Sequence, residues 1–241
     1  MKHYGLIGAK LGHSFSKDFF AELFAKNGIL ADYSNFELAK IEDVKSLMDG
    51  KLDGFNVTIP YKEAIIPYLD ELSPEAALIG AVNTVKISAG KATGYNTDAF
   101  GFQQSIKPFL TSQHERALIL GTGGASKAVA YVFQQIGLDV LFVSRESKGA
   151  KVFAYSDVNE HMIRACKVIV NSTPVGMFPD TTTYPQIPFE ALTADHLVID
   201  LIYNPAETEF LNRAKNAGAT TLNGASMLKE QALKAWSIWN E

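Results

Sequence analysis

The stretch Ala117–Phe133, ALILGTGGASKAVAYVF, decides the fold class of this 241-residue chain. An apolar segment of strand character ends at Leu120, the turn Gly121–Ser126 follows, and a helical pattern continues from Lys127. Glycines allow a tight turn and let backbone N–H groups approach a pyrophosphate at the start of the helix. Ser126 replaces the third glycine of the GxGxxG pattern and is small enough for close packing. The stretch therefore predicts a dinucleotide-binding turn, and the alternative is an ordinary glycine-rich βα turn.

A second strand pattern, LFVSRES at Leu141–Ser147, follows about twenty residues later, where a dinucleotide-binding domain contacts the adenosine ribose. An NAD site usually has Asp or Glu at this strand end, whereas here Ser144 and Arg145 come first and Glu146 follows. A guanidinium suits the 2′-phosphate of NADP, and Lys148 could assist it. The sequence therefore favours NADP, and the alternative is a solvated Arg at the end of a strand.

Strand and helical patterns alternate along the rest of the chain, which predicts an α/β protein with parallel sheets. The strand patterns are His3–Gly8, Tyr33–Leu38, Gly54–Thr58, Thr84–Ser88, Arg116–Leu120, Val140–Val143, Lys167–Asn171 and Leu197–Leu201. The helical patterns are Phe15–Asn27, Ile41–Asp49, Lys62–Leu69, Ala99–Leu110, Ser126–Gly137, Thr208–Ala217 and Ala225–Trp239. We predict an N-terminal α/β unit, a hinge near residue 100 and a second α/β unit, while periodicity does not show where the final helix docks.

Composition excludes several classes of protein. A net charge of −4 disfavours a nucleic-acid-binding surface, and no apolar run is long enough to span a bilayer. The first residues do not resemble a secretory signal, so we expect a cytoplasmic protein. The single cysteine, Cys166, excludes an internal disulfide, and the five histidines lack the spacing of metal ligands. We therefore expect no metal site.

The stretch Gly54–Lys62, GFNVTIPYK, combines a strand pattern with a proline that begins a helix. Lys62 then falls on the first turn of that helix. A cation gains no stability there, because a helix N-terminus already carries partial positive charge. Lys62 is therefore either solvated or placed for chemistry.

Three further polar groups lie at strand ends, where open α/β sheets bind ligands. Ser14 and Ser16 in GHSFSK precede a helix, and capping is the favoured interpretation, with binding of a carboxylate as the alternative. Asn83 lies in GAVNTV, and Asp98 in YNTDAFGF reads as the cap of a helix that starts at Ala99. Lys62, Asn83 and Asp98 could converge in the crevice of one sheet.

These motifs, together with NSTPVGM at 171–177, IYNP at 202–205 and GASMLKEQ at 224–231, resemble those of shikimate dehydrogenase, in order and through nearly the whole chain. The resemblance implies two open α/β domains with a cleft between them. The substrate domain would comprise 1–100 plus 225–241, and the Rossmann-like NADP domain 101–224. It implies NADPH-dependent reversible reduction of 3-dehydroshikimate to shikimate, in the biosynthesis of chorismate and aromatic amino acids. The partner would be a small molecule, not nucleic acid or membrane, and a homodimer is left open.

The resemblance also implies a role for each matching residue. Lys62 and Asp98 would form the catalytic acid–base pair. The substrate would contact Ser14 and Ser16 through its carboxylate, Thr58, Asn83 and Gln231 through ring hydroxyls, and Tyr203 nearby. NADP(H) would contact Gly121, Thr122, Gly123, Gly124 and Ala125 at the pyrophosphate, Ser144 and Arg145 at the adenosine phosphate, and Leu201, Gly224 and Met227 at the nicotinamide. The family commonly has Asn-Arg-Thr where this chain has Ser-Arg-Glu, with no second Arg nearby.

Four alternative functions fit the sequence less well than this one. A relative that acts on both quinate and shikimate with NAD is the nearest alternative, and Ser14, Ser16 and Arg145 favour the narrower activity. A short-chain dehydrogenase needs Tyr-x-x-x-Lys, which no tyrosine of this chain provides. A methylenetetrahydrofolate dehydrogenase is not favoured by the Ser-x-Ser and Asn-Thr-Asp motifs. A non-catalytic nucleotide-binding module is expected to have lost Lys62 or Asp98, and both are present.

Overall fold

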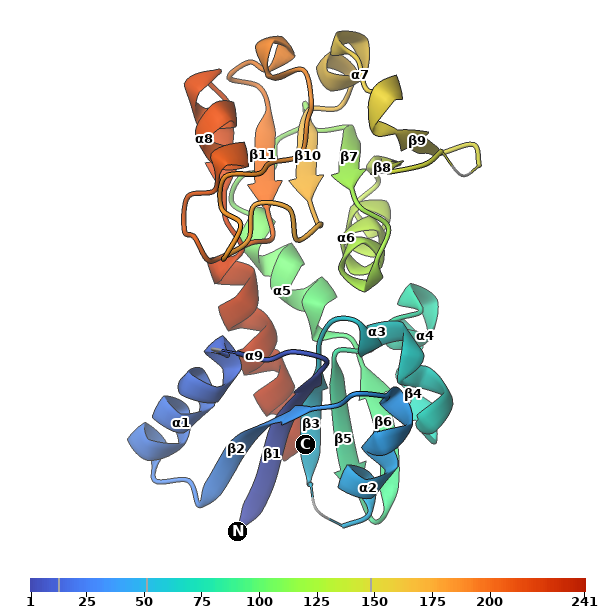
Figure 1. Ribbon diagram of the computed structural model, residues 1–241, viewed down its shortest axis with the longest axis vertical. Helices are drawn as coiled ribbons and strands as arrows, with labels where there is room; N and C mark the ends of the chain where they lie inside the picture. Colours follow the sequence, from blue (N-terminus) through green and yellow to red (C-terminus); the bar gives the residue numbers. More distant parts are fainter. Residues whose placement is uncertain (13, 51, 148) are drawn as a thin grey trace. The chain divides into compact units, whose positions relative to one another are not determined.

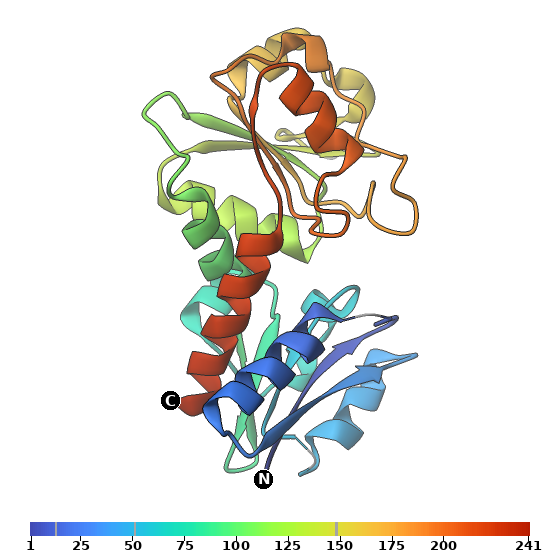
Figure 2. The same ribbon diagram turned by 90° about the vertical axis from the view of Figure 1, so that its left-hand side faces the viewer.

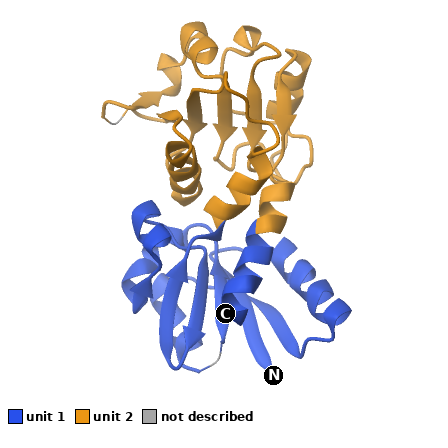
Figure 3. Cartoon of the chain, turned by 180° about the vertical axis from the view of Figure 1, so that it is seen from behind, with its two compact units in different colours: residues 1–97, 231–241 blue, residues 98–230 orange. Residues whose placement is uncertain are grey.

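The computed structural model describes residues 1–12, 14–50, 52–147 and 149–241 (Figure 1). Its contacts divide the chain into two units, coloured separately in Figure 3. Unit 1 comprises Met1–Thr97 and Gln231–Glu241, and unit 2 comprises Asp98–Glu230. The chain passes from one unit to the other within helix α5 (Thr97–Ile106) and again within helix α9 (Ala225–Asn240).

Unit 1 contains a mixed sheet in the order β2-β1-β3-β5-β6-β4. Its strands are β1 (Lys2–Gly8), β2 (Ala31–Glu37), β3 (Gly54–Val57), β4 (Glu71–Leu72), β5 (Thr84–Ser88) and β6 (Lys91–Tyr95). β1 pairs with β2 and β3 in parallel, but β5 is antiparallel to both β3 and β6. The prediction of wholly parallel sheets was therefore wrong here. Ala89 and Gly90, with φ of 50° and 76°, form a tight turn between β5 and β6 that leaves no room for a crossover helix.

Helices cover both faces of this sheet. One face carries α1 (Phe15–Asn27) and the end of α9, which lie side by side in Figure 2 and bury Phe20, Phe24 and Trp239 with Tyr4. The other face carries η1 (Ile41–Val44), α2 (Lys45–Met48), α3 (Tyr61–Ala64), η2 (Ile66–Tyr68) and α4 (Pro74–Ile79). The two helices predicted at 41–49 and 62–69 are each divided into a short 3₁₀ segment and a short α-helix.

The end of α9 is fixed to the sheet of unit 1 by a close contact. Trp239 Nε1 donates to the Val85 carbonyl over 2.9 Å. A Cβ at Gly54 would lie 2.5 Å from the same nitrogen, so only glycine admits the indole there. This packing brings the C-terminal residues into the same unit as the N-terminal strands.

Unit 2 contains a sheet whose pairs are all parallel, in the order β12-β11-β10-β7-β8-β9. Its strands are β7 (Arg116–Leu120), β8 (Asp139–Ser144), β9 (Val152–Ala154), β10 (Val168–Asn171), β11 (Leu197–Asp200) and β12 (Thr220–Leu222). Its other elements are α6 (Gly124–Gln135), η3 (Tyr155–Asp157), α7 (Glu160–Ala165), η4 (Phe189–Ala191) and α8 (Glu209–Asn216). Numbered from β7, the strand order is 3-2-1-4-5-6, which is the order of a Rossmann domain. The predicted α/β class and Rossmann-like unit are therefore confirmed.

Candidate active site

The turn after β7 has the geometry that the glycine pattern predicted. Gly121 adopts a φ of 114°, and a Cβ placed on it would lie 2.7 Å from Ser172 Oγ, so only glycine fits. Gly123 precedes α6 with an extended backbone, and a Cβ there would meet nothing within 4 Å. The turn therefore packs against Ser172 at Gly121, whereas there is empty space beside Gly123.

The first turn of α6 presents backbone donors that no side chain caps. Ser126 Oγ donates to the Gly123 carbonyl over 2.8 Å, so this hydroxyl does not occupy the helix N-terminus. Thr122 and Gly123 are exposed, and Gly124 and Ala125 are half-buried. Because β8 and β10 lie on opposite sides of β7, the turn stands at the switch point of the sheet, where such folds bind a ligand. Uncapped N–H groups at this point suit a pyrophosphate.

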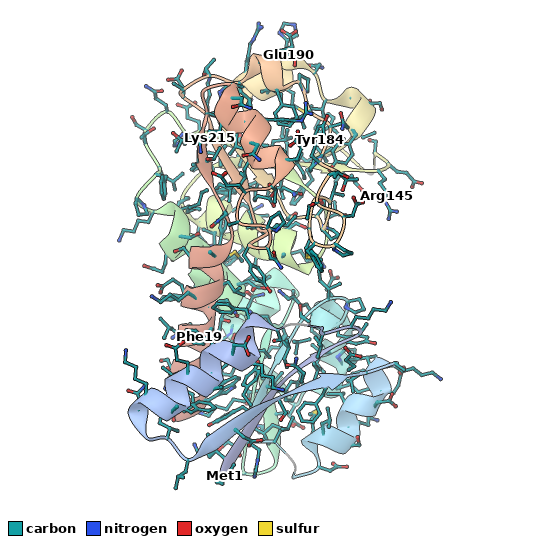
Figure 4. The ribbon with its side chains drawn as sticks, turned by 60° about the vertical axis from the view of Figure 1, so that its left-hand side comes forward. Met1, Phe19, Arg145, Tyr184, Glu190 and Lys215 are labelled. Carbon is teal, nitrogen blue, oxygen red and sulfur yellow. The ribbon has the colours of Figure 1, made fainter. Side chains whose placement is uncertain are left out.

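The end of β8 lies beside this turn, since Gly121 N donates to the Val143 carbonyl over 2.8 Å. Ser144 is the last residue of β8 and is half-buried, and the following Arg145 is exposed (Figure 4). Among the residues that the structure describes, no carboxylate forms an ion pair with Arg145. The guanidinium can therefore meet an external anion. Lys148, considered above as a second contact to the phosphate, lies outside the described residues, as does His13 beside Ser14.

A buried carboxylate joins two other strand ends of unit 2. Asp200 at the end of β11 is fully buried and accepts from Asn171 Nδ2 at 3.0 Å, Ile202 N at 3.1 Å and Thr208 Oγ1 at 2.7 Å. Burial raises the pKa of Asp200 to about 6, and the hydrogen bonds from Thr208, Ile202 and Asn171 oppose this rise. The carboxylate is therefore ionised at neutral pH and holds the starts of two loops together.

In unit 1, Lys62 is the second residue of α3 and is half-buried, as the β3 stretch predicted. Its carbonyl accepts from Val82 N over 2.7 Å, which fixes the backbone that carries the amine. Thr58, also half-buried, directly follows β3 and accepts from Tyr61 N over 2.9 Å through its carbonyl. Because α3 has only four residues, its dipole opposes the Lys62 charge less than the predicted longer helix would.

Ser14 and Ser16 are both nearly buried, but they have different tasks. Ser14 is the N-cap of α1 and its hydroxyl accepts from Lys17 N over 3.4 Å, which agrees with the favoured capping interpretation. Ser16 lies inside the first turn of α1, and its side chain hydrogen-bonds to the Tyr33 hydroxyl. Burial raises the pKa of Tyr33, and the hydrogen bond from Ser16 opposes that rise. The hydroxyls of Ser14 and Ser16 therefore both lie at the N-terminus of α1, and only Ser14 caps that helix.

A cluster of buried amides and hydroxyls surrounds Asn83. Thr97 N donates to Asn83 Oδ1 over 2.7 Å, and a backbone N–H can only donate. This contact fixes the orientation of the Asn83 amide, whose Nδ2 lies 3.0 Å from Thr97 Oγ1 and 3.3 Å from Gln231 Oε1. Asn56 extends the cluster to Thr84 Oγ1 at 3.0 Å. Gln231, although 148 residues from Asn83 in the chain, is thus brought to the same cluster.

The remaining predicted residues are placed as follows. Asp98 is nearly buried in the first turn of α5, which begins at Thr97, so the prediction that Asp98 caps a helix starting at Ala99 was wrong. Tyr203 is 38% exposed in the loop after β11. Leu201 lies against Gly224, because a Cβ on Gly224 would meet the Leu201 carbonyl oxygen, and Met227 is nearly buried in α9.

Sequence reasoning did not single out Asn56 and Thr84 in unit 1, or Asn171 and Asp200 in unit 2. All four are polar residues of a strand and all are buried. A polar residue at the end of an apolar strand was a visible signal, although its partners belong to other strands. In the described ranges no group of three or more His, Cys, Asp or Glu side chains could hold a metal ion. None of the described helices is long and apolar enough to cross a membrane.

A Rossmann sheet with an uncapped glycine turn, together with a second α/β unit that carries a half-buried lysine and a cluster of hydroxyls and amides, defines the class of two-domain dinucleotide-dependent dehydrogenases. The chain is 41% identical to the NADP⁺ shikimate dehydrogenase of Aquifex aeolicus, over 98% of this chain and 90% of that protein. It belongs to the shikimate dehydrogenase family. The model of the shikimate dehydrogenase substrate binding domain matches residues 6–85. The resemblance stated from the motifs is therefore confirmed.

Solved structures of relatives agree with this assignment. Shikimate dehydrogenase 1 from Peptoclostridium difficile has a TM-score of 0.88 and 39% identity, with 100% of this chain and 92% of that chain covered. The shikimate 5-dehydrogenase of Thermus thermophilus, in complex with NADP(H) and shikimate, has a TM-score of 0.87 and 32% identity, over 99% of this chain and 93% of that chain. The likeness therefore covers both units.

Proposed function

We propose that this chain is an NADP-dependent shikimate dehydrogenase that reversibly reduces 3-dehydroshikimate to shikimate, in the biosynthesis of chorismate and aromatic amino acids. Identity of 32–41% over nearly the full length of shikimate dehydrogenases, one of them holding NADP(H) and shikimate, carries this proposal. Unit 1 is the substrate domain and unit 2 the NADP domain of the proposal. Such a biosynthetic enzyme acts in the cytoplasm, and sedimentation of the purified protein decides between a monomer and a homodimer.

The proposed chemistry depends on Lys62 and Asp98. Bound NADPH supplies the hydride to the ketone carbon. The Lys62 ammonium donates a proton to the oxygen that develops negative charge, and it stabilises that charge before the transfer. In the oxidation of shikimate, the neutral amine accepts the proton from the hydroxyl. Asp98 orients the amine and stabilises its charged form.

Except for Tyr203 of unit 2, the substrate residues of the proposal belong to unit 1. Ser14 and Ser16 hold the carboxylate, because two hydroxyls and a helix N-terminus all favour an anion. Asn83 and Gln231 hold ring hydroxyls together with Thr58, and their mutual contact at 3.3 Å supports a shared task. Tyr203 lies near the substrate in this proposal.

The cofactor residues are assigned in unit 2. The backbone of Gly121, Thr122, Gly123, Gly124 and Ala125 binds the pyrophosphate, and Leu201, Gly224 and Met227 line the nicotinamide region. Ser144 and Arg145 bind the 2′-phosphate of NADP. The exposed Arg145, which has no ion-pair partner in the described ranges, supports this assignment.

The overall proposal is tested by a spectrophotometric assay of the purified protein with shikimate or quinate against NADP⁺ or NAD⁺. We expect the highest kcat/KM for shikimate with NADP⁺. Comparable rates with quinate and NAD⁺ would favour the dual-specificity alternative. Absence of turnover together with retained nucleotide binding would favour the non-catalytic module.

The cofactor assignment is tested by Arg145→Ala, with Arg164→Ala, an exposed residue of α7 in the same unit, as the control. One Arg–phosphate contact corresponds to roughly 10- to 150-fold in affinity. We expect the KM for NADP⁺ to rise by such a factor while the KM for NAD⁺ stays nearly unchanged. Equal loss with both cofactors would show that Arg145 only supports the loop.

A further inference from the structure

Three loops leave the same edge of the unit 2 sheet from adjacent strands. Leu120, Asn171 and Asp200 end β7, β10 and β11, and they stand in register, Leu120 opposite Asn171 and Asn171 opposite Asp200. The glycine turn follows Leu120, and the loops 172–178 and 201–208 follow the other two strands. A dinucleotide bound at the switch point extends to both sides of β7. Its adenosine half lies on the β8 side, so the nicotinamide half lies over the ends of β10 and β11.

The Asp200 carboxylate is the group that these two strand ends share. It receives three donors, Asn171 Nδ2 and Ile202 N on Oδ1 and Thr208 Oγ1 on Oδ2. Thr208 Oγ1 accepts from Leu211 N over 3.3 Å, so its own proton is directed to Asp200. Only a carboxylate offers acceptors on both oxygens to three donors in this space. A buried charge is costly for stability, so stability does not explain an Asp at position 200. Its role is to hold its three donor groups in place.

The contacts of Asp200 lead toward the cofactor turn on one side. Asn171 Oδ1 accepts from Thr173 N at 3.0 Å and Thr173 Oγ1 at 2.7 Å, which sets the first turn of the loop 172–178. In that turn, Ser172 Oγ donates to the Leu120 carbonyl over 2.7 Å and closes against Gly121. The carboxylate therefore acts on the glycine turn through Asn171.

On the other side, Asp200 fixes the start of the loop 201–208. Ile202 N donates to Asp200, and the Ile202 carbonyl accepts from Gly224 N over 3.1 Å. Gly224 itself lies against the Leu201 carbonyl. The Asp200 Oδ1 atom thus joins both loops of the nicotinamide side, whereas Oδ2 joins only the cap of α8.

We propose that Asp200 is a positioning residue for the nicotinamide half of the cofactor, acting through Asn171 and Ile202 rather than by touching it. The inference rests on the proposed function and adds a residue to it. In this proposal the contacts of Oδ1 determine the affinity for the cofactor, and the contact of Oδ2 contributes only to the stability of α8. Different substitutions at and around Asp200 can therefore separate affinity from stability.

The test measures the Kd of the full-length protein for NADP⁺ and for adenosine 2′,5′-bisphosphate by calorimetry at pH 7.5, with melting temperatures for each variant. The second ligand carries only the adenosine half of NADP, with its 2′-phosphate and one 5′-phosphate. Asp200→Leu should weaken NADP⁺ binding by about tenfold or more, because two contacts to a charged group are lost. Its Kd for the bisphosphate should change less than about threefold. Asp200→Asn retains an acceptor Oδ1 and should keep NADP⁺ affinity within about threefold of wild type.

Thr208→Val is the matched control, because it removes the contact to Oδ2 and the cap of α8 alone. It should lower the melting temperature and leave both Kd values unchanged. Where Asp200→Leu does not fold, Asn171→Ala removes the same contact from the other side and should reproduce the selective loss for NADP⁺. Unchanged NADP⁺ affinity in Asp200→Leu or Asn171→Ala, or equal loss for both ligands, overturns the inference. Failure of the wild type to bind NADP⁺ overturns the proposed function instead.

Discussion

Unit 1 and unit 2 both place polar groups at strand ends, but unit 1 presents side chains and unit 2 presents backbone. In unit 1 the candidate ligand groups are a lysine, hydroxyls and amides, among which Asn83 and Gln231 are oriented by their neighbours. In unit 2 the candidate ligand groups are the uncapped backbone N–H groups of α6, which follow Gly121 and Gly123 in the chain. The buried side chains of Asn171 and Asp200 only support the loops after β10 and β11. Side-chain truncation should therefore act on the substrate in unit 1. In unit 2, backbone geometry should decide how the pyrophosphate binds, and only the 2′-phosphate should depend on side chains, those of Ser144 and Arg145.

The largest expected effect tests the side-chain half of this comparison. Lys62→Ala should lower kcat by about 10²–10⁴-fold, because a general acid–base group is removed, while the protein folds and binds both ligands. Steady-state kinetics with shikimate and NADP⁺ measure the loss, with Lys40→Ala, an exposed lysine of the same unit, as the control. The Lys62→Ala/Asp98→Asn double variant should be little worse than the worse single variant if the two residues act as a pair. Near-normal turnover in Lys62→Ala would remove the lysine from the mechanism.

The serine pair gives a narrower test in the same unit. Ser16→Ala should raise the KM for shikimate by roughly 10- to 150-fold, the value of one hydrogen bond to an anion, and lower the melting temperature only through the lost hydrogen bond to Tyr33. Ser14→Ala should raise KM by a similar factor and also lower the unfolding free energy by about 1 kcal/mol, because it removes the cap of α1. The KM for NADP⁺ should not change in either variant. An unchanged shikimate KM in both would leave capping as the whole role of the motif.

Two buried titratable groups make the stability of unit 2 depend on pH in opposite directions. The pKa of Asp200 is raised from 3.8 to about 6 by burial, so the native state binds more protons between these values, and its contribution to stability is lost as pH rises through 6. Relative to Asp200→Asn, the wild type should lose about 3 kcal/mol of unfolding free energy between pH 4 and pH 7. Urea unfolding at several pH values measures this difference. A difference that does not vary with pH would show that Asp200 titrates normally.

His196 changes the stability of unit 2 with pH in the opposite direction to Asp200. Burial lowers its pKa, and its ring is held between the Ile163 carbonyl at 3.0 Å and Thr193 N at 3.0 Å. The first contact requires a protonated Nε2 and the second an unprotonated Nδ1, which describes a neutral ring. Its contribution is therefore present above the ordinary His pKa and is lost as pH falls below it. In the same series of urea unfolding measurements, the unfolding free energy of His196→Gln should fall less steeply than that of the wild type as pH falls below about 6.5.

The smallest effects compare two glycines of one turn. Gly121→Ala should destabilise unit 2 by about 1–2 kcal/mol or more, since its φ of 114° and its contact with Ser172 exclude a Cβ. At Gly123 the backbone is extended and a Cβ would meet no neighbouring atom, so Gly123→Ala should hardly change the melting temperature. A Cβ at Gly123 should nevertheless raise the KM for NADP⁺, because the open space is where the pyrophosphate is proposed to lie. Normal cofactor kinetics in Gly123→Ala would remove that space from the cofactor site.

The two units also differed in how well the sequence predicted them. The strand–turn–helix at Ala117–Phe133 and the strands that alternate with helices gave the Rossmann unit, although β9 and β12, with three residues each, were missed. In unit 1 the hairpin of β5 and β6 was missed, because Ala-Gly is a weak turn signal and its strands carry polar residues among the apolar ones. Lys62 was placed correctly at a helix start, whereas Asp98 lies two residues deeper in its helix than expected, since helix ends are poorly marked in sequence.

The sequence by itself determined what depends on neighbours in the chain. It contains the glycine turn, the cap at Ser14, the lysine after β3 and the order of motifs that identified the family. Tertiary structure alone decided which polar groups meet, such as Asn83 with Gln231 and Asn171 with Asp200. The physical reason is that these contacts join residues far apart in the chain, and they form only when burial of apolar surface brings their elements together. The packing of Trp239 on β3 and β5 places Gln231, and the register of β10 and β11 places Asp200.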